Sequence, residues 1–327
     1  MNFNVFVTRR IPDVGLEILK SKCARVDVNP HDRVLTRAEL LEAVRGRDGV
    51  LCLLSDRIDA EVMDAAKNVK VFANYAVGYD NIDVAAATTR GIVITNTPGV
   101  LTDATSDLAW ALLFAVARRI VEADRFTRAG NFTNWGPMLF LGADITGRTL
   151  GIVGAGRIGS AMALKSVGFR MKILYTDERP NPELETKVGA RRVLLEELLR
   201  EADFVSLHVP LTPQTRHLIG KEQLQLMKRT AILINTSRGP VVDEAALVAA
   251  LKEGTIAGAG LDVYEEEPKL QPGLAECENV VLLPHIGSAT TWTRSKMAEM
   301  AATNLIAALE GRMPPNCVNP EALKRRG

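Results

Sequence analysis

A glycine-rich loop near the middle of the chain constrains its fold more than any other feature. Gly154, Gly156 and Gly159 directly follow the apolar run 149–153 and open a helical pattern. In such a strand–loop–helix unit the first glycine permits a tight turn, the second lets backbone approach a phosphate, and the third lets helix and strand pack closely. The helix N-terminus adds free N–H groups and the positive end of its dipole. We therefore expect a dinucleotide to bind at Gly154, Ala155, Gly156, Arg157, Ile158 and Gly159.

An acidic residue follows at the spacing that such a unit requires. Asp177 comes at the end of the next apolar run, 171–176. A carboxylate at this point can accept hydrogen bonds from the adenosine ribose hydroxyls and repels a 2′-phosphate, which favours NAD over NADP. Two alternatives stay open: Arg179 could accommodate a phosphate if the acid turned away, and Asp177 could be an ordinary acid in a surface turn.

Strand-like and helix-like segments alternate along most of the chain. The apolar runs lie at 4–8, 49–54, 69–74, 149–153, 171–176, 204–209, 231–235, 256–261 and 280–283. Helical patterns lie at 14–21, 60–66, from 157 onward, 244–253 and 291–310. Short apolar runs that alternate with helices are typical of βαβ units, so we expect an α/β fold with doubly wound parallel sheets.

One helical pattern is unusually long and extends from about 102 to 129. Its apolar residues cover more than one face. Because a helix that is apolar on several sides must be buried on several sides, we expect it to lie between two domains or two subunits.

Composition excludes several classes of protein. The chain has 40 basic and 39 acidic side chains, a net charge of +1, and an aromatic content of only 5%. This balance argues against a nucleic-acid or anionic-membrane partner. The longest apolar run, 108–117, is too short to cross a bilayer.

The cysteines and the first residues bear on the cellular compartment. Cys23, Cys52, Cys277 and Cys317 are scattered without a CxxC pair, so we interpret them as reduced thiols with no metal or disulfide role. The early residues show no apolar core of a signal peptide. We expect a cytoplasmic protein without a bound metal.

Polar side chains follow three of the later strands. Arg238 comes after the run 231–235, Asp262 and the acidic run 265–267 come after 256–261, and His285 comes after 280–283. In an open α/β sheet, ligands bind outside the carboxyl ends of the strands. An imidazole with a carboxylate is a proton donor of raised pKa, and a guanidinium can clamp a carboxylate. Spacing alone leaves open whether these are catalytic, or are capping and solvated loop residues.

Another histidine sits inside an apolar run. His208 lies within 204–209, where we expect a core or loop-edge residue whose hydrogen bonds are satisfied.

Four segments together resemble a known family. GIVGAGRIG, INTSRGPVVDE, AGLDVYEEEP and LPHIGSAT occur in the order seen in D-isomer-specific 2-hydroxyacid dehydrogenases. The segments NYAVGYDNID, GVLTDATSDLAWALL and NWGPMLFLG are most similar to the glyoxylate/hydroxypyruvate reductases of that family. The resemblance covers essentially the whole chain.

The resemblance implies roles for individual residues. The catalytic residues would be Arg238, Glu267 (the glutamate before Pro268) and His285. Asp262 would contact the nicotinamide amide, and backbone at Val77 and Gly78 would hold the substrate carboxylate together with Arg238 and His285. We also assign to the cofactor site Thr236, Ser237, Arg238, His285 and Gly287.

The resemblance further implies two Rossmann-like domains with an interdomain cleft. The substrate-binding domain would comprise residues 1–98 and 288–327, and the dinucleotide-binding domain residues 99–287. Members of the family are typically homodimers, here expected to pair through the helical region 102–129.

The expected reaction is the NAD(P)H-dependent reduction of glyoxylate or hydroxypyruvate to the D-2-hydroxy acid, with His285 as proton donor. Val77 stands where phosphite-oxidising relatives carry a lysine, which argues against that activity. Leu139 stands where some glyoxylate reductases carry a tryptophan, which leaves the substrate preference open. The alternatives are a dehydrogenase of the same family that acts on 2-ketogluconate or another 2-oxo acid, and a corepressor-like regulator that senses NAD.

Overall fold

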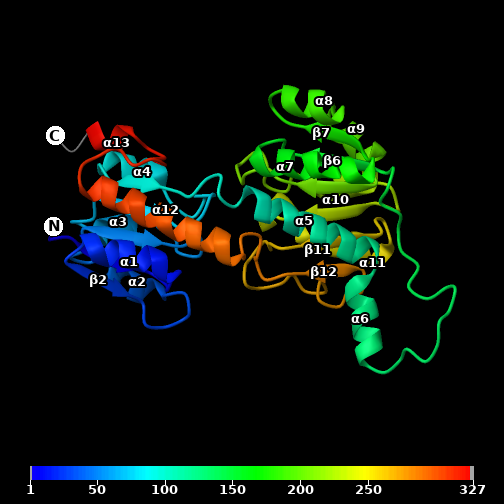
Figure 1. Ribbon diagram of the computed structural model, residues 1–327, viewed down its shortest axis with the longest axis horizontal. Coiled ribbons are helices and arrows are strands. Elements are labelled where there is room, and N and C mark those ends of the chain that lie inside the picture. The colour runs from blue at the N-terminus through cyan, green and yellow to red at the C-terminus, as the bar shows by residue number, and fades with distance from the viewer. Residues whose placement is uncertain (1, 325–327) are drawn as a thin grey trace. The chain divides into compact units, whose positions relative to one another are not determined.

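The computed structural model describes residues 2–324 and divides the chain into two compact units. The first unit is assembled from both ends of the chain, up to Leu101 and from Ser288 onward, and the second comprises Thr102–Gly287. Each unit is built on its own parallel sheet flanked by helices (Figure 1). The expected α/β class with two Rossmann-like domains is confirmed.

The sheet of the first unit runs in the order β2-β1-β3-β4-β5. Its strands are β1 (Asn4–Val7), β2 (Arg25–Val28), β3 (Gly49–Cys52), β4 (Val71–Asn74) and β5 (Val93–Thr95). The helices of this unit are α1 (Asp13–Lys22), α2 (Arg37–Ala43), α3 (Ala60–Ala65), α4 (Val84–Thr89), α12 (Thr291–Leu309) and α13 (Glu321–Lys324). The C-terminal α12 packs against α1 and against the sheet, and this contact joins the two chain ends into one unit (Figure 1).

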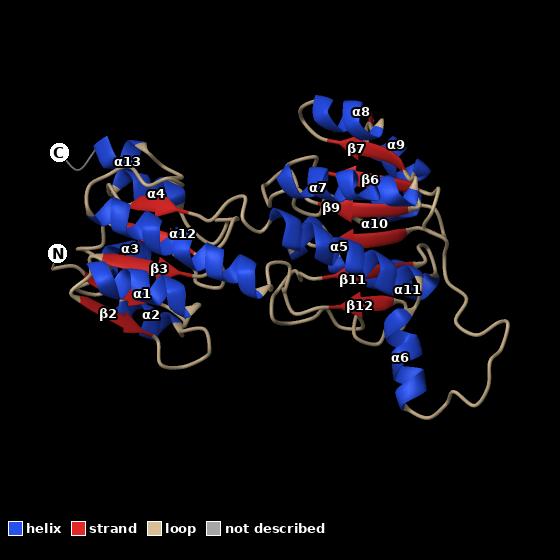
Figure 2. Cartoon of the chain, viewed as in Figure 1, coloured by secondary structure: helices blue, strands red, loops and turns tan. Residues whose placement is uncertain are grey.

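The sheet of the second unit runs in the order β12-β11-β10-β9-β6-β7-β8 (Figure 2). Its strands are β6 (Thr149–Val153), β7 (Lys172–Thr176), β8 (Arg191–Arg192), β9 (Phe204–Leu207), β10 (Ile232–Asn235), β11 (Gly258–Leu261) and β12 (Val280–Leu282). The helices are α5 (Thr102–Ala117), α6 (Ile120–Arg128), α7 (Arg157–Lys165), α8 (Pro182–Val188), α9 (Leu195–Glu201), α10 (Lys221–Leu226) and α11 (Glu244–Glu253), with short 3-10 turns at Ser166–Phe169 and Gly239–Val241.

The second sheet is buried on both faces, which explains its continuous apolar strands. Along β10, Ile232 and Ile234 join the apolar cluster that includes residues of α5 and α7, whereas Leu233 joins the cluster that includes residues of α9, α10 and α11. This alternation follows from the two-residue period of a strand. Burial on both faces leaves the ends of the strands as the places where polar groups can gather.

The expectation of one long helix over 102–129 is wrong. The helix ends at Ala117, Arg119 adopts a left-handed backbone with a φ of 52°, and α6 begins at Ile120. The carbonyl of Ala117 accepts a hydrogen bond from the N–H of Ala143 (2.8 Å), which takes the place of a bond within the helix. A contact from a later part of the chain therefore ends α5, and none of the residues of α6 is buried in the single chain.

Two further findings concern residues 2–324. Across this range, every helix is too short or too polar to serve as a membrane span. Within the same range, no three or more His, Cys, Asp and Glu side chains are grouped so as to hold a metal ion.

Candidate active site

The predicted polar residues of the second unit come together at one edge of its sheet. The glycine loop follows β6, Arg238 follows β10, Asp262 follows β11 and His285 follows β12. All of these strands pair in parallel, in the order β12-β11-β10-β9-β6, so their carboxyl ends lie at the same edge.

The glycine loop is closely packed on one side and open on the other. Gly154 has a φ of +94°, and an added Cβ there would lie 2.8 Å from the backbone of His208. A Cβ on Gly159 would lie 2.1 Å from the carbonyl oxygen of Gly154, so that helix α7 packs directly on the turn. At Gly156 a Cβ would meet nothing within 4 Å, which leaves the open side of the loop to a ligand at the N-terminus of α7.

Asp177 lies against this loop. The N–H of Ala155 donates to Asp177 Oδ2 (2.7 Å), and the N–H of Arg179 donates to Asp177 Oδ1 (3.2 Å). Asn181 closes the same turn, since its side-chain amide donates to the carbonyl of Ala155 (2.9 Å). The carboxylate thus sits beside the glycine loop, where the ribose of a bound dinucleotide would lie.

Two buried polar atoms at this edge lack a hydrogen-bond partner among the described residues: Thr236 Oγ1 and His208 Nδ1. Buried polar atoms are nearly always satisfied, so an unpaired one at a site suggests a missing ligand. Together with the open side of Gly156, these atoms fit a bound nicotinamide dinucleotide.

His208 is only partly the satisfied histidine that we expected. Its Nε2 lies 2.9 Å from Ser206 Oγ and 3.3 Å from Met162 Sδ, while Nδ1 is the atom without a partner among the described residues. Burial lowers the pKa of His208 to about 4, so the ring is neutral at pH 7. The sequence placed His208 inside the apolar run 204–209, but β9 ends at Leu207, so that His208 follows the strand.

His285 and Glu267 form a direct pair. The Nδ1–H of His285 donates to Glu267 Oε2 (2.9 Å), and His285 has a left-handed backbone with a φ of 55°. Both side chains are partly accessible, 26% for His285 and 30% for Glu267. Burial raises the pKa of Glu267, but the hydrogen bond from His285 and its charge outweigh burial, so that the pKa lies below its usual value.

Arg238 belongs to the same cluster. It follows β10, which pairs with β11, the strand before Glu267, and its charge helps to lower the pKa of Glu267. The main chain at Arg238 is fixed because the side chain of Asn235 donates to its carbonyl (3.0 Å), and its Nη1 donates to the carbonyl of Ser237 (2.9 Å). The second unit therefore brings an imidazole, a carboxylate and a guanidinium together.

Asp262 holds the backbone that follows His285. Its Oδ1 and Oδ2 accept from the N–H groups of Ile286 and Gly287, both at 2.7 Å. The side chain is buried, and burial raises its pKa. Asp262 thus orients the His285 loop, a role that spacing did not suggest.

Tyr264 was not among the predicted site residues. Its N–H donates to Glu267 Oε1 (3.1 Å), and its hydroxyl donates to the carbonyl of Leu283 (2.8 Å), two residues before His285. Burial raises the pKa of Tyr264 to about 12. Tyr264 therefore connects the loop after β11 with the end of β12. The sequence pattern around Tyr264 did not predict this role.

Val77 and Gly78 lie in the first unit, apart from the other predicted residues in the chain. Their carbonyls accept hydrogen bonds from the side chains of Asn96 and Asn74, both at 2.8 Å. These bonds fix the orientation of the loop after β4, which is again the carboxyl end of a strand.

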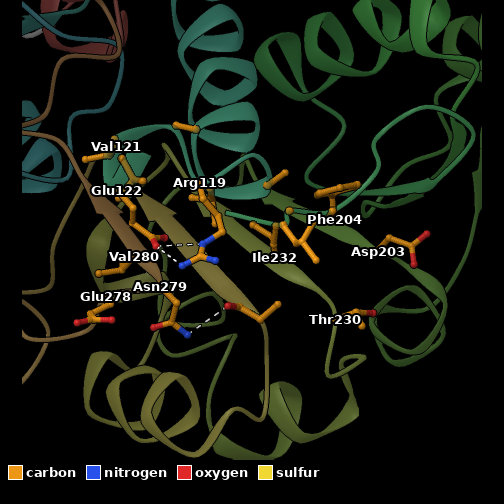
Figure 3. A pocket seen from close by; sticks show the side chains of 18 of the residues that line it. Arg119, Val121, Glu122, Asp203, Phe204, Thr230, Ile232, Glu278, Asn279 and Val280 are labelled. Atoms are coloured by element: carbon orange, nitrogen blue, oxygen red, sulfur yellow. Dashed lines mark hydrogen bonds and ion pairs between the residues drawn. The ribbon is translucent and has the colours of Figure 1, made fainter. Parts of the chain in front are cut away.

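A cavity of about 510 Å³ lies at the opposite edge of the second sheet (Figure 3). It is lined by residues that precede strands, among them Asp203, Thr230 and Asn279, and by Arg119 and Glu122. Figure 3 shows these last two side chains joined by hydrogen bonds. None of the predicted site residues lines this cavity.

Comparison with known proteins leads to the same family as the sequence resemblance, and the match extends along the whole chain. Residues 110–287 match the model of "D-isomer specific 2-hydroxyacid dehydrogenase, NAD binding domain". A glyoxylate reductase of Thermococcus kodakarensis is 56% identical over 330 aligned residues, which cover 100% of this chain and 99% of that protein.

Solved structures agree with this result. A crystal structure of a Thermus thermophilus protein has a TM-score of 0.89 and 51% identity, and the match covers 96% of this chain and 99% of that one. An NADPH-dependent glyoxylate/hydroxypyruvate reductase of Sinorhizobium meliloti, solved with NADP and malonate, has a TM-score of 0.85 and 33% identity over 98% of each chain. The geometry of the second unit and these matches lead to one conclusion: the chain belongs to the D-isomer specific 2-hydroxyacid dehydrogenase family, whose members are oxidoreductases with a nicotinamide cofactor.

Proposed function

We propose that this protein reduces a small 2-oxo acid, glyoxylate or hydroxypyruvate, to the 2-hydroxy acid. The observation that carries the proposal is the His285–Glu267 pair, with Arg238 nearby, at the sheet edge that also bears the glycine loop. A reduction of this kind needs a proton donor, a cation for the substrate and a dinucleotide site. The relative named glyoxylate reductase, at 56% identity, supports glyoxylate as a substrate.

His285 is the proposed proton donor. Glu267 accepts the hydrogen bond from Nδ1–H, which leaves Nε2–H to protonate the carbonyl oxygen as it becomes a hydroxyl. The carboxylate stabilises the positively charged imidazolium before the transfer and keeps the ring in one orientation, as an acid does in other His–carboxylate pairs. In the reverse direction the neutral His285 is the base.

Arg238 and the first unit would hold the substrate. The guanidinium of Arg238 can bind the substrate carboxylate through two hydrogen bonds and polarise the carbonyl oxygen. Backbone N–H groups at Val77 and Gly78 would bind the same carboxylate.

The glycine loop, Asp177, Thr236, Ser237 and Gly287 would hold the cofactor, and Asp262 would accept from the nicotinamide amide. The reduced nicotinamide, when bound, supplies the hydride for the keto carbon. We propose NAD as the preferred form, because the Asp177 carboxylate beside Ala155 would repel a 2′-phosphate. The NADPH-dependent Sinorhizobium relative makes this preference a point for measurement.

We also propose a homodimer that pairs through the region from α5 to α6. In the single chain α6 has no buried residue, and large apolar side chains are exposed in the segment after it, namely Phe132, Trp135, Met138 and Leu141. Several large exposed apolar side chains within one short segment favour a protein interface there. Sedimentation velocity of the parent and of Trp135→Asp tests the dimer, and a parent that sediments as a monomer would contradict it. The cytoplasmic location also stays a prediction.

A panel of 2-oxo acids tests the proposed reaction. Oxidation of NADH and of NADPH would be followed with glyoxylate, hydroxypyruvate, pyruvate and 2-ketogluconate. We expect the largest kcat/KM with glyoxylate or hydroxypyruvate and NADH, and the D isomer of glycerate from hydroxypyruvate. A larger value with 2-ketogluconate would identify a different dehydrogenase of the family, and no turnover with any acid would favour a regulator that senses NAD.

A further inference from the structure

His217 and Glu265 form a second histidine–carboxylate pair, and Glu265 lies two residues before Glu267 in the chain. The Nε2–H of His217 donates to Glu265 Oε1 at 2.5 Å. The guanidinium of Arg216 lies 3.9 Å from the same oxygen. His217 has a left-handed backbone with a φ of 52°, as His285 does. The proposed reaction does not use this second pair.

Glu265 is also anchored from its other side. Its N–H donates to Glu244 Oε1 (2.8 Å), and the N–H of Glu244 donates back to Glu265 Oε2 (3.4 Å). Glu244 begins α11 and is 2% exposed, and burial raises its pKa. Both the backbone and the side chain of Glu265 are therefore fixed to elements outside its own loop.

The same pair reaches the loop that carries Arg238. The N–H of His217 donates to the carbonyl of Pro240 (2.8 Å), two residues after Arg238. Between them, Gly239 lies so close to the main chain of Tyr264 that an added Cβ would be 1.8 Å from its carbonyl atoms. His217 thus binds one loop through its backbone and the other through its side chain.

We propose that His217 and Glu265 are positioning residues that hold the main chain at 264–265 in place for Glu267. Tyr264, which donates to Glu267 Oε1, is the neighbour of Glu265 in the chain. Fixing Glu265 therefore fixes the N–H that orients the Glu267 carboxylate toward His285. This inference rests on the proposed function and deepens it, since the pair would act on the proton transfer and not on binding.

The opposing view is that this is an ordinary surface ion pair. His217 is 42% exposed, and exposed ion pairs contribute about 0–1 kcal/mol to stability. A stability measurement alone cannot separate the two views. The catalytic constants and their pH dependence can, because an ordinary surface pair would change neither.

The three adjacent glutamates offer a matched series. Glu265→Gln removes the charge that His217 binds, Glu266→Gln is the control at an exposed neighbour, and Glu267→Gln removes the proposed partner of His285. With the best 2-oxo acid, we expect Glu265→Gln and His217→Gln to lower kcat by about 10-fold, with the KM for NADH within about 2-fold of the parent.

The pH dependence of kcat should separate the same variants. The profile of Glu265→Gln should move in the direction of the Glu267→Gln profile, while Glu266→Gln keeps the parent profile. The titratable and charged groups that face Glu265 are His217, Arg216 and Glu244. His217→Gln leaves the other two in place, so a shared shift in both variants identifies the pair and not the local charge.

A spectroscopic measurement makes the inference testable without turnover. The chain has four histidines, so the ¹⁵N signals of labelled imidazoles can be assigned with single His→Gln variants. We expect the His285 Nδ1 signal to shift in Glu265→Gln and in His217→Gln, and to stay unchanged in Glu266→Gln. If the parent reduces no 2-oxo acid, the proposed function fails and this signal alone decides the positioning role.

Three results would overturn the inference. One is a kcat and a pH profile in Glu265→Gln that match those of Glu266→Gln in an active parent. Another is a His285 signal that neither variant shifts. The third is a loss of NADH binding and of melting temperature in proportion to the loss of activity in both variants, since that would indicate a purely structural contact.

Discussion

The two edges of the second sheet differ in how their side chains are held. At the carboxyl edge, side chains bind the backbone of other loops: Asp262 accepts from Ile286 and Gly287, and Tyr264 donates to Leu283. At the amino edge, around the cavity of about 510 Å³, Asp203 and Asn279 also bind distant backbone, at Thr149 and Ala257, but the exposed ion pairs Arg119–Glu122 and Arg148–Asp144 join near neighbours.

This difference has a physical consequence. A side chain that binds the backbone of a distant loop fixes the relative positions of two loops, which is what a catalytic arrangement needs. Exposed pairs between near neighbours fix little and contribute little to stability. We therefore expect substitutions at the carboxyl edge to affect chemistry and those at the amino edge to affect stability or assembly.

The largest effect that we predict is at His285. His285→Gln should lower kcat for the reduction by about 1,000-fold, because the general acid is lost. Steady-state kinetics with the best 2-oxo acid would measure this, with His31→Gln as a control at an exposed histidine of the first unit. A kcat within a few-fold of the parent would remove the proton-donor role and with it the main contrast between the edges.

His208 should make stability depend on pH. The pKa of His208 is about 4 in the folded chain against its ordinary value of 6.5, so the unfolded chain binds a proton that the native chain excludes. The contribution of neutral His208 to the free energy of unfolding is fully present above pH 6.5. It falls by about 3 kcal/mol as the pH drops toward 4. Urea unfolding at pH 7 and pH 4 should show this additional loss in the parent and not in His208→Gln. An equal loss in both proteins would mean that His208 is accessible to protons in the native state.

A substitution of Gly142 tests the same comparison at the amino edge, where this residue lines the cavity. An added Cβ would lie 2.3 Å from the carbonyl oxygen of Ala117, where the chain closes the end of α5. Gly142→Ala should lower the free energy of unfolding by about 2 kcal/mol, with kcat changed by less than about 3-fold. Gly136→Ala is the matched control, because its Cβ would meet only Leu139 at 3.9 Å. A large fall in kcat without loss of stability would show that this edge also serves the chemistry.

The smallest predicted effect concerns the cofactor. Asp177→Asn should raise the KM for NADH by about 10-fold while the KM for NADPH rises less or falls, because the charge that repels a 2′-phosphate is gone. Kinetics with both cofactors, beside Glu178→Gln at the exposed neighbour, would measure this. Equal changes for the two cofactors would mean that Asp177 mainly holds the N–H of Ala155.

Much of the fold could be predicted because its signals are local. Strands β3, β6 and β10 are short apolar runs, and helix α7 begins at Arg157, directly after the second glycine of the loop. The strands β2, β5 and β8 and the helices α2, α4, α8, α9, α10 and α13 escaped prediction. Strands β2 and β8 carry charged residues, and all of these elements are short. Such elements are stabilised by their neighbours and not by their own sequence pattern.

The candidate site divides in the same way. Residue spacing led to Arg238, Asp262 and His285 as strand-end residues, and the family resemblance selected Glu267 from three adjacent glutamates. Neither indicated that Asp262 binds the backbone after His285 or that Tyr264 links two loops.

By itself, the sequence determined the α/β class, the dinucleotide loop and the order of the strand-end residues, because apolar period and glycine spacing are properties of neighbouring residues. Only the tertiary structure decided where α5 ends, which atom of His208 lacks a partner among the described residues, and that His217 meets Glu265 across 48 positions of the chain. These outcomes depend on contacts between segments far apart in sequence. The energy of such a contact depends on both segments together and cannot be predicted from either one alone.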